Sequence, residues 1–432
     1  MSLLKAFANA FRVPDLRNKI LFTLLIIAVY RLGAHIPTPG IDVEAAQRIA
    51  AQGSPDGAFQ LINLFSGGAL TQMAVFALGI MPYITASIIM QLLTVVIPRL
   101  EAWSKEGESG TKKITQWTRY LTVVLAVLQS TGIAFLFNRG ADQLGFPPGV
   151  VLIPEFTPPR VALIVLSLTA GTALIMWLGE LITQRGIGNG MSILIFASIV
   201  STLPAEYLAI YQQEDLAVFL GLVAIAVFII VGIVTVEQGQ RRIPVQYAKR
   251  VVGRRMYGGT STYIPLKVNQ AGVVPIIFAS SVLYIPTLLQ NTIQSPGLQR
   301  WISDNILDSG AVTHMVIYGL LVVFFTYFYT AITFNPVDVS DNMKKYGGFI
   351  PGIRPGRQTA EYLDRILTRI TLPGALFIAA IALMPNIFLA FFDIQRLPFG
   401  GASILITVGV TLETMKQIES QLMMRHYEGF LT

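Results

Sequence analysis

Long apolar runs separated by shorter polar segments repeat along the whole chain. Ten runs are long enough to cross a bilayer, because about 20 helical residues span its hydrocarbon core. They fall near residues 20–36, 73–97, 117–137, 161–181, 188–203, 216–236, 271–290, 312–333, 371–391 and 402–420, of which the fifth is short. The pattern predicts an all-α membrane protein with ten transmembrane helices and both termini on one side.

Composition supports this class. Hydrophobic residues make up 53% of the 432 positions and charged residues only 13%, whereas soluble domains carry roughly 25% charged residues. The first run leads into Pro37-Thr38-Pro39-Gly40 without a small-residue cleavage site, so we expect it to remain as a span. The sequence has no cysteine and three widely separated histidines, which excludes thiolate sites and argues against a histidine metal centre.

Basic residues lie almost entirely on one side of the predicted spans. Apart from six, all 31 lysines and arginines occur in the terminal segments or in the loops on the side of the N-terminus; the exceptions are Arg31, Arg48, Arg139, Arg160, Arg300 and Arg396. The positive-inside rule makes the basic side cytoplasmic. The net charge of +7 is therefore first a sign of topology, although a cytoplasmic loop that contacts ribosomal RNA stays open.

Ten spans divide into two sets of five. An odd number of spans in each half makes the halves inverted in the membrane, as in many channels and transporters. We expect an N-terminal half over 1–210 and a C-terminal half over 211–432. The two halves show no strong sequence similarity, so this expectation rests on the span count.

Two cytoplasmic loops are long, at about 237–270 and 334–370. In the first, residues 240–247 and 262–268 alternate in period two around glycines, which predicts a basic β-hairpin. In the second, the glycines and prolines of 347–356 predict a fixed, non-helical shape that presents Arg354. Both loops fit a docking surface, and solvated charge beside the membrane is the alternative.

Catalytic motifs are not found. Residues 107–113 lack the spacing of a phosphate-binding loop, and the glycines of 186–190 join two spans as a tight turn. We therefore predict no enzyme activity and no cofactor, with energy supplied by a partner or a gradient. Charges within the apolar runs are few (Arg31, Glu180 and Glu413). Because an ion-coupled carrier usually needs midplane charges, a passive conduit is favoured over a secondary transporter built on inverted repeats, which remains the alternative.

The second span has an unusual beginning. A short amphipathic piece over 59–70 contains Gly67-Gly68, a pair that can break a helix. Broken helices at membrane depth occur only where protein or a cavity satisfies the backbone. This region is a candidate for a pore-lining or re-entrant element.

At these residues the chain resembles a known family. Residues 65–70 (FSGGAL) and 76–93 (FALGIMPYITASIIMQLL) are similar to the plug and second helix of the SecY family, the central channel subunit of the bacterial Sec translocon. Further matching stretches are 105–110, 177–197, 240–250, 263–281, 347–356, 399–410 and 427–430. They occur in family order from near residue 14 to the end of the chain.

The resemblance implies a protein-conducting channel in the bacterial cytoplasmic (inner) membrane, which passes unfolded secretory polypeptides and releases hydrophobic segments sideways into lipid. Its apolar pore ring is expected at Ile80, Ile84, Ile195, Ile277 and Ile406. A plug helix is expected over 61–72, including Leu61, Ile62, Asn63, Leu64, Phe65, Ser66, Gly67, Gly68, Ala69 and Leu70. Ile80 and Ile84 lie on one helical face, which agrees with the ring, although each isoleucine alone fits ordinary packing equally well.

The resemblance also implies a lateral gate between spans 2 and 3 on one side and spans 7 and 8 on the other. Its residues would include Thr85, Ser87, Gln129, Ser281 and Ile285. The implied partners are the small membrane subunits SecE and SecG, the motor ATPase SecA, the ribosome, signal sequences, nascent chains and lipid, with no small-molecule substrate. Docking would use Arg241, Arg242, Lys249, Arg250 and Arg354.

Overall fold

Ten long helices form the bulk of the molecule. The computed structural model describes residues 11, 13–42, 44–45, 63–139, 152–153, 155–213, 215–247, 250–252, 255–257, 261–290, 295–308, 310–392 and 401–428. Within these residues the ten predicted spans correspond to α2 (Pro14–Gly33), α5 (Met81–Val96), α7 (Glu108–Arg139), α8 (Pro158–Arg185), α9 (Gly190–Gln213), α10 (Leu216–Gln238), α11 (Val274–Gln290), α13 (Val312–Thr333), α15 (Arg357–Phe392) and α16 (Gly401–Glu428). The predicted ten-helix fold is confirmed.

Most of these helices are apolar enough to cross a membrane individually. Six described helices meet that standard by length and composition, and a seventh is obtained if α5 and the following α6 (Pro98–Lys105) count as one broken span. These two helices are bent by 100° at Ile97, where Pro98 begins α6 and cannot continue a straight helix. The remaining three, α2, α11 and α16, are shorter or carry more charge.

Several predicted boundaries were wrong. The run 73–97 was expected as one span, but residues 67–80 form turns and α5 begins only at Met81. Gly67, Gly68 and Gly79 have positive φ angles of 65°, 85° and 54°, which a right-handed helix does not accommodate. The fifth span is not short, because α9 continues through Pro204 to Gln213.

The predicted glycine turn at 186–190 joins α8 to α9. Gly188 has a φ of 79°, a conformation that glycine adopts without a steric penalty. The Asn189 side chain accepts a hydrogen bond from the Met191 backbone N–H at 3.1 Å, at the start of α9. The turn is therefore a helix connection, as predicted.

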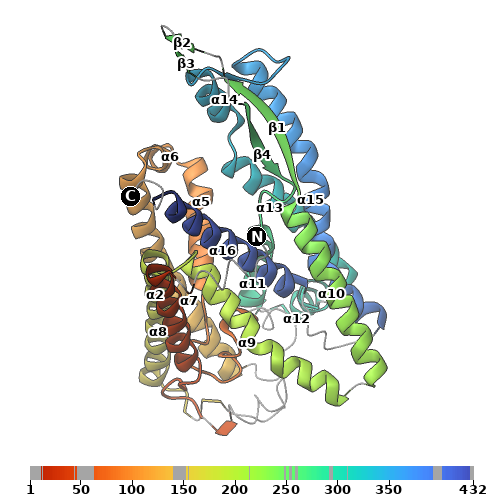
Figure 1. Ribbon diagram of the computed structural model, residues 1–432. Helices are drawn as coiled ribbons and strands as arrows, with labels where there is room; N and C mark the ends of the chain where they lie inside the picture. The colour runs from red at the N-terminus through yellow and green to blue at the C-terminus, as the bar shows by residue number, and fades with distance from the viewer. Residues whose placement is uncertain are drawn as a thin grey trace.

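The first of the two long loops is the predicted β-hairpin. Strands β1 (Gln240–Tyr247) and β4 (Ser261–Lys267) pair antiparallel, with Gln240 opposite Lys267 and Gln246 opposite Ser261. Between them β2 (Arg250–Val252) pairs with β3 (Arg255–Tyr257) at the far tip. Figure 1 shows this hairpin projecting from one end of the helical bundle, beside α15.

The second loop joins the same sheet. Strand β5 (Gly348–Phe349) pairs with the end of β1, which makes a three-stranded sheet in the order β4-β1-β5. Beneath it lies a separate apolar core to which α14 (Pro336–Lys345) and α15 also contribute; its buried members are Ile243, Val245, Leu266, Met343, Ile350, Leu363 and Ile366. The two long loops, which are predicted to be cytoplasmic, are therefore one packed unit, called the cytoplasmic unit below.

The connection between α11 and α13 is also structured. Helix α12 (Pro296–Ile302) continues into a short π-helix, η2 (Ser303–Leu307), which contacts both α11 and α13. His314 Nδ1 lies 2.6 Å from the Ile306 carbonyl oxygen, so the start of α13 is tied back to η2.

Candidate functional site

The five predicted ring isoleucines come together in space. Ile80, Ile84, Ile195, Ile277 and Ile406 all belong to one buried hydrophobic cluster in the middle of the helical bundle. Ile80 and Ile406 are fully buried, and Ile84 is 9% exposed. They come from four separate segments of the chain, so the fold, and not sequence proximity, brings them together.

The described part of the predicted plug, residues 63–72, folds back on itself in a compact turn, called the plug knot below. Its backbone makes one helical turn over 63–66 and then reverses at Gly67 and Gly68. The Asn63 side-chain oxygen accepts hydrogen bonds from the backbone N–H and the hydroxyl of Thr71, at 3.2 and 3.3 Å. These bonds close the loop on itself. Leu61 and Ile62 lie outside the described residues.

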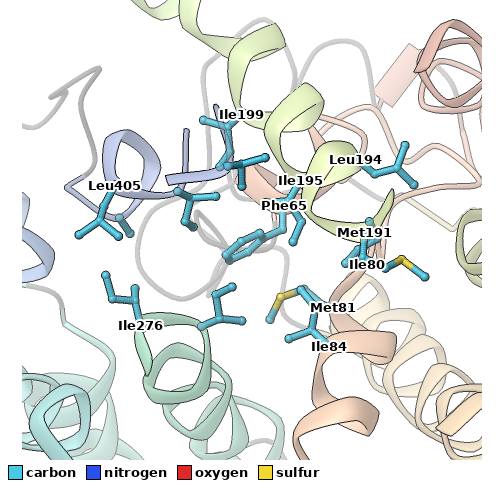
Figure 2. Close-up of a cluster of buried hydrophobic side chains, with 14 of the residues drawn as sticks. Phe65, Ile80, Met81, Ile84, Met191, Leu194, Ile195, Ile199, Ile276 and Leu405 are labelled. Carbon is cyan, nitrogen blue, oxygen red and sulfur yellow. The ribbon is translucent and has the colours of Figure 1, made fainter. Parts of the chain in front are cut away.

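Phe65 is the side chain of the knot that lies in the isoleucine cluster. Its side chain is 1% exposed and belongs to the same cluster as the ring isoleucines. In Figure 2, Phe65 lies between Ile195 from α9 and the side chains of Met81 and Ile84 from α5. An aromatic ring is therefore packed within the same apolar cluster as the predicted ring isoleucines.

The predicted gate residues lie on helices that meet. Helices α5 and α11 pack against each other; Thr85 and Ser87 are on α5, and Ser281 is on α11. Gln129 is buried on the neighbouring α7, and the Ile285 side chain lies outside the described side chains.

The hydroxyls of the predicted gate residues form hydrogen bonds within their own helices. Thr85 donates to the Met81 carbonyl oxygen at 3.0 Å, and Ser281 donates to that of Ile277 at 2.8 Å. Ser87 accepts from the Gln91 amide at 3.5 Å. Because these hydroxyls form their hydrogen bonds within a single helix, separating α5 from α11 leaves the bonds intact.

The predicted docking residues lie on the cytoplasmic unit. Arg241, Arg242 and Arg354 are exposed, and the Arg242 guanidinium lies 4.9 Å from the centre of the Tyr263 ring. This cation–π contact joins β1 to β4. Arg250 is in strand β2, but its side chain and all of Lys249 lie outside the described part.

Comparison with known proteins identifies the family. The SecY family model matches residues 74–415, which is more than half of the chain. The chain belongs to the SecY family. It is 60% identical to the protein translocase subunit SecY of Streptomyces coelicolor, over 99% of this chain and all of that protein. Identity to the corresponding Mycobacterium tuberculosis subunit is 54% over the same shares.

Solved structures share the SecY fold. One described as a protein conducting channel superimposes with a TM-score of 0.64 at 16% identity, covering 94% of this chain and 92% of that one. Sec61 from a canine ribosome-channel complex superimposes with a TM-score of 0.61, also at 16% identity and with the same coverage. Identities this low establish the common fold alone.

An ion pair joins two helices of this SecY-family fold. Arg119 on α7 donates from Nε and Nη2 to the two carboxylate oxygens of Glu180 on α8, each at 2.7 Å, and from Nη1 to Gln116 at 2.9 Å. Glu180 is one of the few charges that interrupt an apolar run. Its bidentate partner explains how the bundle tolerates it, and the pair fastens α7 to α8.

Loss of Arg119 should lower stability more than loss of the pair. We expect Arg119→Met to destabilise the chain by about 1.5–3 kcal/mol, because Glu180 keeps its charge without a partner. Arg119→Met/Glu180→Met should recover most of this loss, since an apolar replacement of both partners removes the unpaired charge. The midpoint of heat-induced aggregation in detergent measures the effect.

Arg357→Met is the matched control for this experiment. Arg357 pairs with Glu361 at 2.9 Å, but its side chain is 93% exposed. Exposed ion pairs contribute little to stability. Equal destabilisation by Arg119→Met and Arg357→Met would show that the Arg119–Glu180 pair has no special role.

Sequence reasoning missed the side chains that hold the knot from α2 and α9. Tyr30 and Arg31, at the end of α2, and Ser198 on α9 all lie against residues 66–67. Arg31 was noted only as a charge within an apolar run. A charged residue at membrane depth, next to a tyrosine, was the available signal.

Proposed function

We propose that this chain is the protein-conducting channel of a bacterial Sec translocon. It passes unfolded secretory polypeptides across the membrane and releases hydrophobic segments laterally into the bilayer. The observation that carries the proposal is the buried hydrophobic cluster that holds the five predicted ring isoleucines together with Phe65. An apolar constriction excludes ions by dewetting and closes around a chain without specific bonds.

Two features favour a channel over a coupled carrier. Two of the three charges that interrupt the apolar runs, Arg31 and Glu180, are engaged by Gly67 and Arg119, so neither is free to bind a transported ion. The central cluster is apolar, whereas a small polar substrate needs placed hydrogen-bonding groups. The energy for translocation then comes from a partner.

The proposed halves, 1–210 and 211–432, fit the packing of the helices. Helices α2, α5, α7, α8 and α9 pack among themselves, and α11, α13, α15 and α16 form a second set; α5–α11 and α9–α16 are among the contacts between them. Separation at α5 and α11 would open the ring toward lipid, so this seam is the proposed lateral gate. The termini and the basic sheet face the cytoplasm of a bacterial inner membrane.

The proposed partners dock on the cytoplasmic unit. Because β5 joins the hairpin sheet, Arg241, Arg242 and Arg354 belong to one rigid body and can act on one partner together. That partner is the motor ATPase SecA or the ribosome. Two solved relatives in this fold are channels recorded with ribosomes, the canine Sec61 and yeast Ssh1 complexes. SecE and SecG are the proposed small membrane subunits.

Replacement of a bacterium's own channel subunit tests this function. In cells depleted of that subunit, the full chain should sustain export, measured as cleavage of a signal sequence from a secreted reporter. Arg354→Glu should reduce motor-driven export at least about tenfold, which corresponds to 1.4 kcal/mol of lost binding. The control is Arg357→Glu, a position three residues away that is also exposed. A parent chain that inserts stably but never sustains export would contradict the proposal.

A further inference from the structure

The plug knot is held from outside by the last turn of α2. Tyr30 is fully buried, and its hydroxyl lies 3.3 Å from the Ser66 carbonyl oxygen and 2.6 Å from Ser198 Oγ on α9. The neighbouring Arg31 donates from Nη1 to the Gly67 carbonyl oxygen at 2.9 Å. Two adjacent side chains therefore bind two adjacent carbonyls of the knot.

The hydroxyl contacts form a chain from α9 to the knot. A serine or tyrosine hydroxyl has one proton to donate. The Ser198 hydroxyl also lies 2.9 Å from the Leu194 carbonyl oxygen of its own helix, so its one proton goes either to Leu194 or to Tyr30. When it goes to Tyr30, the Tyr30 hydroxyl donates to the Ser66 carbonyl and all three segments are connected. Phenylalanine at position 30 would keep the packing and remove only this connection.

Residues of α2 and the segment that follows it pack closely against the knot and the residues after it. The Phe76 ring, which follows the knot in sequence, stacks on Tyr30 with a centroid separation of 5.8 Å. A side chain at Gly33 would overlap that ring. Beyond α2, the Val75 N–H donates to the Ile36 carbonyl oxygen at 2.9 Å. Both ends of the segment 66–75 are therefore anchored on α2 and the residues that follow it.

The contact between Arg31 and the knot requires glycine at position 67. Its φ of 65° favours glycine. A Cβ atom at this position would lie 2.6 Å from Arg31 Nη1 and 3.3 Å from Ser198 Cβ. The close approach of three segments at one carbonyl leaves no room for a side chain beside the Arg31 guanidinium.

We propose that Tyr30 and Arg31 are positioning residues that latch the plug, and that the strength of this latch determines how readily a signal sequence opens the channel. The proposal rests on the assignment of residues 61–72 as a plug in the function proposed above. By fixing Ser66 and Gly67, the latch places the adjacent Phe65 in the isoleucine ring. Weakening it should allow the plug to leave the ring without a strong signal sequence.

Tyr30→Phe tests the latch with the smallest change. The full chain, produced with its small membrane subunits, is compared with the parent in two assays: ion leak across reconstituted vesicles, and export of a reporter whose signal sequence is weakened by a charge in its apolar core. We expect both to rise about two- to tenfold, the range for one hydrogen bond, with a further rise in Tyr30→Phe/Arg31→Met. Export of a reporter with an intact signal sequence should stay near the parental level.

Thr172→Val on α8 is the control for a buried hydroxyl. Thr172 is 2% exposed, and its hydroxyl donates to the Leu168 carbonyl oxygen of its own helix. A merely structural role of Tyr30 predicts that both substitutions lower heat stability and that neither changes leak. The latch predicts a change in leak for Tyr30→Phe only.

Substitution of the ring residue Ile84 separates failure of the latch from failure of the channel. The latch is overturned if Tyr30→Phe and Arg31→Met leave leak and selectivity unchanged while Ile84→Asn raises both. The proposed function itself fails if Ile84→Asn changes neither and the parent does not export.

Discussion

A disulfide between cysteines placed at Thr85 and Ile285 should stop protein export, and a reducing agent should restore it. Thr85 is on α5, and Ile285 is on α11, one turn beyond Ser281. These two helices pack together. A covalent bond between them holds the seam closed, so a polypeptide can neither widen the ring nor leave it sideways. We expect export to fall to the level of cells without a functional channel.

The absence of cysteine from the chain makes this experiment clean, because every crosslink comes from the introduced pair. Export is followed as signal-sequence cleavage before oxidation, after oxidation, and after reduction with dithiothreitol. Each single-cysteine variant should export normally under all three conditions.

A second pair of cysteines tests whether a crosslink between any two helices affects export. Ser130 on α7 and Thr169 on α8 approach within 3.5 Å through their hydroxyls, and both helices belong to the proposed N-terminal half. A disulfide there should leave export unchanged, since the seam stays free. Efficient Thr85–Ile285 crosslinking with undiminished export would contradict the gate.

Polar substitution within the ring should open the seal. We expect Ile84→Asn or Ile406→Asn to raise ion leak about 5- to 150-fold, and to allow export with defective signal sequences. An asparagine amide buried among apolar side chains has no hydrogen-bond partner, which costs about 1–3 kcal/mol in the closed state. That penalty shifts the closed–open equilibrium by the stated factor. Conductance of reconstituted vesicles measures it.

Two controls separate the ring from general packing. Ile84→Leu and Ile406→Leu keep the volume and the apolar surface, so they should retain the seal. Ile164→Asn puts the same amide at a fully buried isoleucine of α8, in a different cluster. It should lower stability without increasing leak. If Ile164→Asn leaks as strongly as Ile84→Asn, or if neither ring variant leaks, the ring assignment is wrong.

The two long strands of the basic hairpin could be predicted from the local sequence pattern. Its two strands were predicted at 240–247 and 262–268, and β1 and β4 occupy 240–247 and 261–267. The period-two alternation places Ile243 and Val245 on the buried face. The sequence could not predict β5, because two residues carry too little periodicity and their partner lies in another loop.

The second span shows where the pattern misleads. Residues 73–80 are as apolar as a helix, yet they form turns. Hydropathy reports that a segment is buried, but not whether its backbone is helical. The positive φ of Gly67, Gly68 and Gly79, together with backbone bonds from Thr38 to Met73 and from Val75 to Ile36, makes the difference. The latter bonds depend on where α2 ends.

By itself, the sequence determined the membrane class, the ten helices and the hairpin, and it predicted that the basic side is cytoplasmic, because hydrophobicity, charge and periodicity are properties of short segments. Only the tertiary structure decided that Phe65 enters the isoleucine cluster. It also decided that Tyr30 reaches Ser66, that Arg119 pairs with Glu180, and that the two cytoplasmic loops share one sheet. Each of these contacts joins residues far apart in the chain, and their meeting depends on how whole helices pack.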